Sequence, residues 1–493
     1  MAKIKIDLDR RIGSVDRRIY GGFIEHLGRC IYGGIFDEGS LLSDEYGFRR
    51  DVIEALEALR IPVLRWPGGN FVSGYHWLDG VGPVEQRPRR LELAWHAEES
   101  NRFGTNEFLQ YCELLDIEPY LCVNMGNGTI DEAQAWVEYC NGTGNTYWAN
   151  LRRKHGREEP YKVKYWGLGN EMYGNWQIGA LDAVDYSKKA REFAKVMKWT
   201  DPGIKLVSCG MTGWDDWDRI VLEALAPFVD FHSIHIYTGS NEYYNNVFLP
   251  HQAERALKSC QAVIDRVRYQ QDIKHPIYVA YDEWNIWFRE ASELGVLEER
   301  YTLADALAVA TYLNIFIRHC RTVRMANLAQ MVNVLSPILT SKDGLFLQTI
   351  YFPLLLYAKY MQGIALDVYV ESERYELLRE EIPAWHHHRI LDLGPFQLLD
   401  AAGTYYEAEN VLALAVVNRD QEHVHTSTVQ LTDAGSLVGA EVYEVNGASP
   451  SDINSFEEPE AVSVCQQTLE VNGQSFTYTF PAHSLTLLRL RLV

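Results

Sequence analysis

The sequence predicts an α/β protein in which a (β/α)8 TIM barrel is followed by a C-terminal antiparallel β-sandwich domain. Up to about residue 365, short β-rich runs alternate with longer segments of helical period, and eight such alternations are typical of a closed barrel. After residue 366, short β-rich runs follow one another without helices between them. A doubly wound open sheet is the alternative, but it usually carries a glycine-rich phosphate loop after its first strand, and this sequence has none there.

Eight runs are expected to form the barrel strands. They cover residues 19–24, 63–65, 120–124, 165–168, 205–209, 231–235, 277–281 and 325–329. The segments between them have the period of amphipathic helices. In residues 48–59, for example, Val52, Leu56 and Leu59 fall on one helix face. The same pattern predicts helices at 105–115, 186–199 and 301–317.

The predicted domains are a barrel over residues 14–365 and a β-sandwich over residues 366–493. In residues 1–13, Ile4 and Ile6 alternate with charged side chains, which predicts a strand. A barrel normally begins at its own first strand, so this N-terminal strand is expected to join the sandwich.

Two local patterns support the sandwich prediction. Phe476, Tyr478 and Phe480 alternate with threonines, which is the period of a half-buried strand. The dipeptide 472–473 is Asn-Gly and stands between two β-rich runs, so a hairpin is expected at this point.

The charge balance excludes several classes of partner. Lys and Arg number 46 against 67 Asp and Glu, a formal net charge of −21, which argues against nucleic-acid and anionic-membrane binding. No segment reaches the ~18 consecutive apolar residues of a membrane span, and no signal-peptide pattern opens the sequence. The eight cysteines lack C-x-x-C spacing, which is typical of buried thiols in a reducing compartment. We therefore expect a cytoplasmic protein with no nucleic-acid or membrane partner.

Polar side chains follow nearly every predicted barrel strand. Barrel enzymes carry their catalytic groups at the C-terminal ends of the strands, so these side chains are expected to converge on one rim. The candidates are Glu25, Arg65, Asn70, Asn170, Glu171, His235, Tyr237, Glu283 and Gln330.

Glu171 and Glu283 form the most informative pair, because each follows an apolar run and would stand at the rim. Glycoside hydrolysis needs two carboxyl groups, one protonated to release the leaving oxygen and one ionised. A separation of about 5–5.5 Å indicates a retaining enzyme and about 6.5–9.5 Å an inverting one. Repulsion from an ionised Glu283 is expected to raise the pKa of Glu171. The alternative for either residue is a helix cap or a rim salt bridge.

Several neighbours of this pair have chemistry that suits a sugar site. The Asn170 amide could hold a sugar hydroxyl beside the reacting carbon, and Tyr237 could donate to the nucleophile. Arg65 follows a β run, and a buried arginine needs a carboxylate partner, for which Glu25 or Glu283 would serve. For His235 a role in core packing competes with a role in the site.

Four tryptophans could stack on sugar rings or pack beneath the rim. They are Trp66, Trp95, Trp284 and Trp287. Nucleotide-binding, serine-hydrolase and zinc-protease motifs are absent, and the histidines lack zinc-ligand spacing, so neither a metal nor a cofactor is expected. A non-catalytic carbohydrate-binding barrel and a metal-dependent barrel hydrolase are the alternatives from other classes.

The sequence resembles the α-L-arabinofuranosidases of glycoside hydrolase family 51. The resemblance rests on YGGFIEHLGRCIYGGIFDEGS, VLRWPGGNFVSGYHWLDGVGPVEQRPRRLELAW, FGTNEF, YWGLGNEM, FHSIHIY, YDEWNIW and ANLAQMVNVLSPI, which run nearly end to end. It implies that Glu171 is the general acid/base and Glu283 the nucleophile of a retaining, exo-acting enzyme. The implied ligands of the sugar or supports of the site are Glu25, Arg65, Asn70, Trp95, Asn170, His235, Tyr237, Trp287 and Gln330.

The resemblance also implies an arabinose-containing oligo- or polysaccharide substrate, no metal or cofactor, and a homo-oligomer, usually a hexamer. The stretches after Tyr237 and Trp287 are shorter than in well-known bacterial members, and these loops shape the outer subsites. An endo-β-1,4-glucanase or a broader β-glycosidase of the same family is the alternative.

Overall fold

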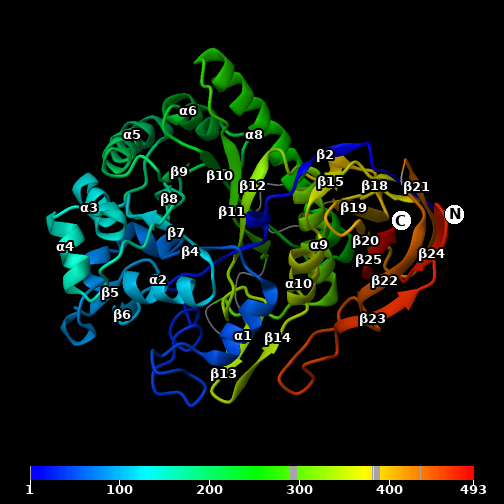
Figure 1. The fold of residues 1–493 in the computed structure, drawn as a ribbon, viewed down its shortest axis with the longest axis horizontal. Coiled ribbons are helices and arrows are strands. Elements are labelled where there is room, and N and C mark those ends of the chain that lie inside the picture. The colour runs from blue at the N-terminus through cyan, green and yellow to red at the C-terminus, as the bar shows by residue number, and fades with distance from the viewer. Residues whose placement is uncertain (1, 289–296, 380, 382–388, 434) are drawn as a thin grey trace.

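Eight parallel strands close into a barrel in the computed structural model, which describes residues 2–288, 297–379, 381, 389–433 and 435–493 (Figure 1). The barrel strands are β3 (Gly21–Phe23), β4 (Val63–Trp66), β7 (Glu118–Val123), β8 (Tyr165–Leu168), β9 (Lys205–Ser208), β10 (Phe231–Thr238), β11 (Tyr278–Ile286) and β12 (Val323–Ala329). They follow one another around the barrel in chain order, and β12 pairs with β3 to close it. The predicted fold class is therefore confirmed.

Ten α-helices are described, and most of them surround the barrel. They are α1 (Arg50–Leu59), α2 (Thr105–Leu114), α3 (Ile130–Asn141), α4 (Tyr147–Lys154), α5 (Ala183–Thr200), α6 (Asp216–Leu225), α7 (Tyr243–Phe248), α8 (His251–Gln270), α9 (Leu303–Arg318) and α10 (Tyr351–Tyr360). Helix α9 begins with a capping box, in which the Asp305 N–H donates to Thr302 and the Thr302 N–H donates to Asp305. Its residues from 303 to 317 are all buried, because α9 packs against both the barrel and the sandwich.

The limits of several strands differ from the prediction, and those of β3, β10 and β11 bear on the site. Residues Arg17–Tyr20 form a 3-10 turn, and only β3 pairs within the first predicted run. A Cβ on Gly21 would lie 2.5 Å from the Val63 side chain, so glycine lets β3 approach its neighbour. Strands β10 and β11 extend past their predicted ends, with a shift in register between Ser233 and His235. His235, Tyr237 and Glu283 consequently stand within strands, not after them.

The C-terminal part is built from two sheets. One has the order β16 (Tyr369–Glu371), β1 (Ala2–Asp7), β21 (His425–Thr432) and β24 (Ser475–Phe480). The other has the order β2 (Arg11–Ser14), β15 (Ile364–Leu366), β19 (Leu399–Tyr406), β20 (Val411–Asn418), β25 (Ser484–Leu492), β22 (Leu437–Asn446) and β23 (Ser463–Leu469). All the pairings are antiparallel except the parallel pair β1–β21. Ile4, Ile6, Leu414, Val429 and Leu488 pack in the core between the sheets.

The hairpin predicted at Asn472-Gly473 is wrong. Strand β23 pairs with β22 in the larger sheet, whereas β24 pairs with β21 in the smaller one. Gly473 has a φ of +80°, so the dipeptide does turn the chain, but the turn carries it from one sheet to the other. A turn signal specifies only a local change of chain direction, and the pairing partners of the two flanking strands are set by contacts with distant segments.

Three two-stranded sheets complete the described strands. They are β5 (Arg90–Glu92) with β6 (Ala97–Glu99), β13 (Ile338–Ser341) with β14 (Gly344–Leu347), and β17 (Arg374–Tyr375) with β18 (Phe396–Gln397).

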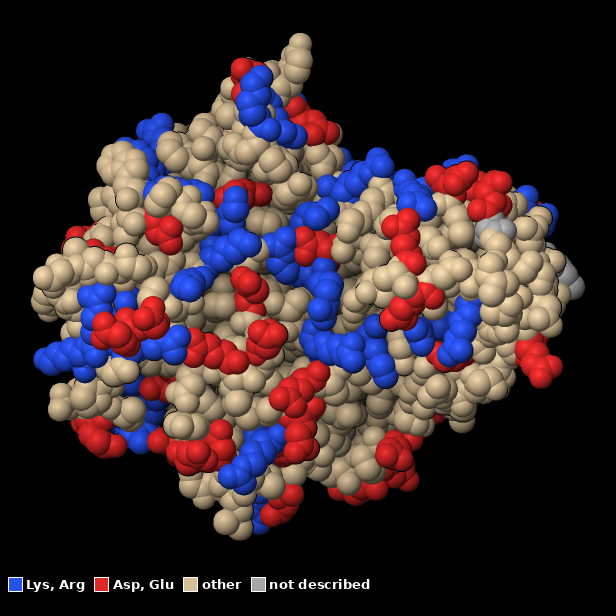
Figure 2. All heavy atoms as spheres, viewed as in Figure 1, with Lys and Arg blue, Asp and Glu red and all other residues tan. Residues whose placement is uncertain are grey.

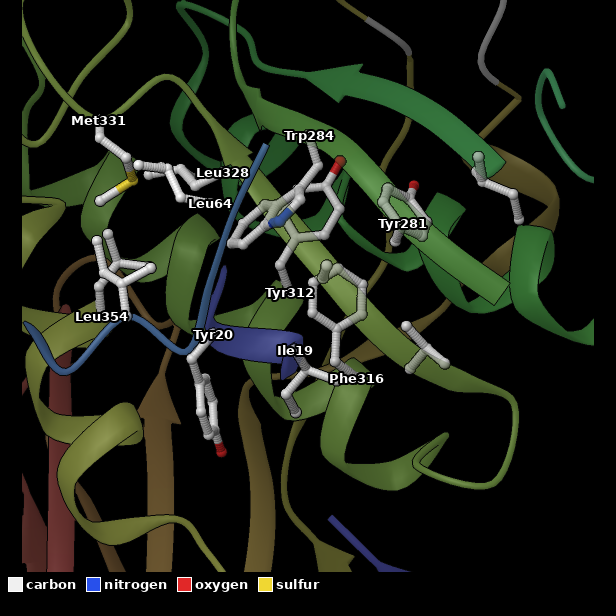
Figure 3. Close-up of a cluster of buried hydrophobic side chains, with 14 of the residues drawn as sticks. Ile19, Tyr20, Leu64, Tyr281, Trp284, Tyr312, Phe316, Leu328, Met331 and Leu354 are labelled. Atoms are coloured by element: carbon white, nitrogen blue, oxygen red, sulfur yellow. The ribbon is translucent and has the colours of Figure 1, made fainter. Parts of the chain in front are cut away.

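Aromatic side chains fill the space between the barrel and α9 (Figure 3). Ring centroids of Trp284 lie 5.0 Å from Tyr312 and 5.2 Å from Phe316, both of α9. Successive residues of a strand point to opposite faces, so Trp284 points outward where Glu283 points inward. Trp66 is also fully buried, stacked at 5.0 Å on Phe108. These two of the four tryptophans therefore pack in the core.

The surface carries both charge signs despite the net charge of −21. Figure 2 shows Lys and Arg side chains gathered in a band across the middle of one face, between the barrel and the sandwich. Among the described residues, no helix is long and apolar enough to cross a membrane.

Candidate active site

A cavity of about 660 Å³ opens at the C-terminal ends of the barrel strands. All the predicted site residues line it except Arg65 and Asn170, which lie beneath it. The lining ones are Glu25, Asn70, Trp95, Glu171, His235, Tyr237, Glu283, Trp287 and Gln330. The convergence expected from strand ends is therefore present in the folded chain.

Glu283 stands on β11 directly opposite His235 of β10. The Tyr237 hydroxyl donates to its Oε1 at 2.8 Å, and the Arg65 Nη1 donates to its Oε2 at 2.8 Å. One donor on each oxygen fixes the orientation of the carboxylate, and the arginine contact is a charge-assisted hydrogen bond. The Trp287 ring packs edge-on against Tyr237, with centroids 5.2 Å apart.

Glu171 follows β8 after a tight turn through Gly169 and Asn170. Gly169 has a φ of +80°, and a Cβ there would lie 2.9 Å from the Met125 Cβ. The Trp176 indole N–H donates to Glu171 Oε2 at 2.8 Å, and the Tyr173 hydroxyl lies 3.3 Å from Oε1. The turn thus carries the carboxyl group to the edge of the cavity.

His235 lies between the two carboxylates. Its Nδ1 is 3.0 Å from Glu171 Oε1 and 3.5 Å from Glu283 Oε2, while its Nε2 is 3.2 Å from Asp282 Oδ1. Burial favours the neutral imidazole, but the charges and hydrogen bonds of these three carboxylates raise the pKa of His235 to about 10. The ring is therefore a cation at neutral pH.

This cation reverses the expected direction of the pKa shift of Glu171. Burial opposes ionisation of Glu171, but the hydrogen bond and the charge from His235 outweigh it and lower its pKa. The prediction of a raised pKa is wrong for this arrangement, because it considered only repulsion from Glu283. One carboxylate oxygen of Glu171 and one of Glu283 lie within 4.8 Å of each other.

Arg65 and Asn170 form the layer beneath the cavity, each with 1% of its surface exposed. Arg65 Nη2 donates to Asn170 Oδ1 at 2.5 Å, and Arg65 Nε lies 3.8 Å from Asp282 Oδ2. Of the two partners predicted for Arg65, Glu283 is an ion-pair partner and Glu25 is not among its hydrogen-bonded contacts. The Asn170 Nδ2 is buried and has no hydrogen-bond partner within the described part of the chain.

Glu25 occupies the other side of the cavity. Its Oε1 accepts hydrogen bonds from the Phe71 N–H at 2.9 Å and the Trp95 indole at 3.0 Å, and its Oε2 accepts one from Gln330 at 3.1 Å. Burial raises the pKa of Glu25 to about 8 despite these donors. Asn70 accepts a hydrogen bond from the Gln177 amide at the same wall.

Comparison with known proteins places the chain in a family. Residues 55–255 match a family model described as the α-L-arabinofuranosidase 1 domain, and residues 282–484 match one described as the α-L-arabinofuranosidase C-terminal domain. A probable α-L-arabinofuranosidase C of Aspergillus clavatus is 46% identical, over 99% of this chain and 96% of its own length. The chain belongs to glycoside hydrolase family 51.

Further relatives agree with that assignment, which makes the chain a glycosidase. The Bacillus subtilis protein named intracellular exo-α-(1→5)-L-arabinofuranosidase 1 is 41% identical over 90% of this chain and 88% of its own. The α-L-arabinofuranosidase of Thermotoga maritima, solved as an arabinose complex, superimposes with a TM-score of 0.92 at 42% identity over all of both chains. The family 51 enzyme of Thermotoga petrophila gives 0.93 at 42% identity, over 99% of this chain and 100% of that one.

Some site residues of this family 51 enzyme were missed by sequence reasoning. Asp282 accepts hydrogen bonds from Tyr120 and Ser233, both at 2.7 Å, and holds the Nε2 side of His235. Contact with Arg65 and His235 outweighs burial and lowers the pKa of Asp282. Asp282 directly precedes Glu283, and a residue next to an inward-facing one in a regular strand points outward. The shift in strand register between Tyr281 and Trp284 breaks this alternation, so Asp282 also points inward, toward Arg65.

Trp176 was also missed, and it contacts Glu171 from a loop that has no strand or helix pattern. An aromatic residue five positions after Glu171, in a glycine-containing loop, was the available signal. The stretch after Trp287, predicted to be short, falls largely on residues 289–296, outside the described residues.

Donor atoms of Glu171, His235 and Glu283 are close enough together to contact one cation. The charges beside them oppose it, since His235 is itself cationic and Arg65 lies 2.8 Å from Glu283. The absence of a metal therefore remains a prediction, supported by the charge of the neighbours.

Proposed function

We propose that the enzyme is an exo-acting α-L-arabinofuranosidase that removes terminal non-reducing α-L-arabinofuranosyl residues from arabinan, arabinoxylan or their oligosaccharides with retention of configuration. One observation carries the proposal: carboxylate oxygens of Glu171 and Glu283 line one cavity within 4.8 Å of each other. Retaining glycosidases hold the two carboxyl groups about 5–5.5 Å apart, whereas inverting ones leave about 6.5–9.5 Å for a water molecule. The names of the relatives support the arabinofuranosyl substrate.

In the first step Glu283 attacks the anomeric carbon while Glu171 gives a proton to the leaving oxygen. The bond from the anomeric carbon to the leaving group breaks as the ester to Glu283 forms. Tyr237 and Arg65 each hold one oxygen of the nucleophile, so its lone pair is aimed at the sugar without a reorganisation cost. In the second step Glu171 takes a proton from water, which attacks the anomeric carbon and releases Glu283.

His235 supplies the proton that Glu171 needs. The pKa of His235, raised to about 10, places a proton on this ring, whose Nδ1 is 3.0 Å from Glu171 Oε1. Its transfer to Glu171 leaves a neutral imidazole and a carboxylic acid ready to donate. In the second step Glu171 takes a proton from water and passes it back to His235. Both residues then regain the protonation state in which the cycle began.

Glu25, Asn70 and Gln330 are proposed to hold the hydroxyls of the terminal sugar, and Trp95 to lie near the leaving group. Glu25, Trp95 and Gln330 are joined to one another by hydrogen bonds, which supports a closed wall fitted to one terminal ring. The unpartnered Nδ2 of Asn170 is proposed to donate to the hydroxyl next to the anomeric carbon. We further propose a cytoplasmic homo-oligomer, a location that agrees with the word intracellular in the name of the Bacillus subtilis relative.

A panel of aryl glycosides tests the activity: the α-L-arabinofuranoside, the β-D-xyloside and the β-D-glucoside, with carboxymethylcellulose alongside. We expect hydrolysis of the arabinofuranoside. NMR should show that the α-anomer of the sugar is released first, because retention keeps the configuration of the substrate. Cleavage of carboxymethylcellulose but not of the arabinofuranoside would establish the endo-glucanase alternative. Binding of arabinosides without turnover would instead indicate a non-catalytic barrel, and loss of activity in EDTA a metal-dependent hydrolase.

A further inference from the structure

A second cavity, of about 670 Å³, lies between the barrel and the β-sandwich, away from the rim of the active site. Helices α8 and α9 form one side, and the strands from β16 to β19 form the other. Five cationic side chains line it against two carboxylates, Glu254 and Asp400. The cations are Arg255, Lys258, Arg318, Arg374 and Arg419. A positive cavity is unexpected in a protein whose net charge is −21.

Arg419 is the most unusual member of this cavity, because 1% of its surface is exposed. Its Nη2 donates to the Gln397 carbonyl at 2.6 Å and its Nη1 to His251 Nε2 at 2.8 Å, while the guanidinium stands 4.7 Å from the Phe248 ring centroid. Its Nε has no hydrogen-bond partner, and no carboxylate of the described chain lies within 4 Å of it. Burial lowers the pKa of Arg419 to about 10, and the charge of Asp400, which lies beyond ion-pair distance, offsets this only in part.

The two carboxylates that line the cavity are already engaged. Glu254 pairs with Lys258 at 2.7 Å along helix α8, and Asp400 pairs with Arg318 at 3.1 Å. Arg374, on the exposed strand β17, has no ion pair among the residues that the structure describes. Arg255 pairs at 2.5 Å with Asp392, which lies outside the cavity lining. Arg374 and Arg419 are then the two cations of the lining that have no ion pair within 4 Å among the described residues.

We propose that this cavity is a binding site for a small organic polyphosphate or sugar bisphosphate, separate from the glycosidase centre. Guanidinium groups present paired donors that match phosphate oxygens, and Arg419 is held in position by Gln397, His251 and Phe248 before any ligand arrives. The volume falls within the about 300–1,000 Å³ of small-molecule sites. An oligosaccharide bearing uronic carboxylates has the same oxyanion chemistry but carries one charge per ring, so it concentrates less charge near the guanidinium groups than a phosphate compound does.

The test is isothermal titration of the full-length enzyme with inorganic pyrophosphate and with fructose 1,6-bisphosphate, at matched ionic strength in phosphate-free buffer. One saturable site per chain is expected, with a rise in Tm, because a ligand of the folded state stabilises it. A saturating concentration of arabinose should leave the titration unchanged, since the active site is a different cavity. Titration with digalacturonate tests whether the cavity binds carboxylate ligands more tightly than phosphate ligands.

Arg374→Glu is the first variant, because Arg374 is exposed and its loss leaves the core intact. It should weaken pyrophosphate binding about tenfold or more, as loss of a charge-assisted contact does. Arg191→Glu on α5 is the matched control, with the same change in net charge outside the cavity, and should bind as the parent does. Arg419→Gln should abolish binding if it folds.

Three outcomes would overturn the proposal: no saturable binding of either phosphate compound, equal weakening in Arg374→Glu and Arg191→Glu, or tighter binding of digalacturonate than of pyrophosphate. Each can be read whether or not the enzyme cleaves arabinofuranosides.

Discussion

Replacement of Tyr237 by phenylalanine isolates one hydrogen bond to the proposed nucleophile. The hydroxyl donates to Glu283 Oε1 at 2.8 Å in a buried site, and burial together with the Glu283 charge raises the pKa of Tyr237 well above its usual value. The group therefore remains a donor at every working pH. A hydrogen bond to a charged group contributes about 1.5–3 kcal/mol, so kcat/KM on an aryl arabinofuranoside should fall about 10- to 150-fold. Arg65 still holds Oε2, which limits the loss to this range.

Tyr139→Phe is the control for this experiment. Tyr139 lies on α3, outside the active-site cavity, and its hydroxyl donates to Asn106 at 2.9 Å. The Tyr139→Phe variant should therefore change kcat/KM by less than about twofold. Steady-state kinetics with both variants, with far-UV circular dichroism to verify folding, gives the comparison. If Tyr237→Phe loses less than threefold, the hydroxyl does not orient the nucleophile and the reasoning fails.

The remaining predictions concern the nucleophile, the buried histidine and the aromatic core. Glu283→Ala should abolish turnover of aryl arabinofuranosides, and azide should restore it with an inverted glycosyl azide as product; turnover without azide would contradict the assignment. His235 has its pKa raised from 6.5 to about 10, so its proton stabilises the fold fully below about pH 6.5 and this stabilisation is lost as the pH rises to about 10. The free energy of unfolding by urea should accordingly fall more over that interval in the parent enzyme than in His235→Gln, and equal falls would refute it. Trp284→Ala should cost about 3–5 kcal/mol of unfolding free energy, because it empties the space between β11 and α9. A loss below about 1 kcal/mol, from the same urea titration, would mean that this core repacks.

Much of the barrel was predictable because hydrophobic periodicity is a local property. The runs at 165–168 and 205–209 match β8 and β9 closely, since each is a short β-rich run followed by a glycine. The run at 19–24 matches less well, because Arg17–Tyr20 turns before Gly21 can pair. The outward direction of the Trp284 side chain could also be predicted, because successive residues of a strand face opposite ways and Glu283 was expected to face inward.

Pairings between sheets were less predictable. Asn472-Gly473 has the sequence of a hairpin turn, yet β23 pairs with β22 in one sheet and β24 pairs with β21 in the other. These pairings join segments far apart in the chain, which a local turn signal does not specify. Trp176 belongs to a loop without periodicity, so no pattern connected it with Glu171.

Local sequence was sufficient to predict which polar side chains reach the rim, because the C-terminal ends of parallel barrel strands always converge there. Tertiary structure alone decided their charges. His235 is 64 residues from Glu171 and reverses the direction of its pKa shift, since electrostatic interactions depend on distance in space and not along the chain. For the same reason the net charge of −21 gave no indication of the basic cavity, where Arg374 and Arg419 meet side chains of α8 and α9 only after the two domains pack together.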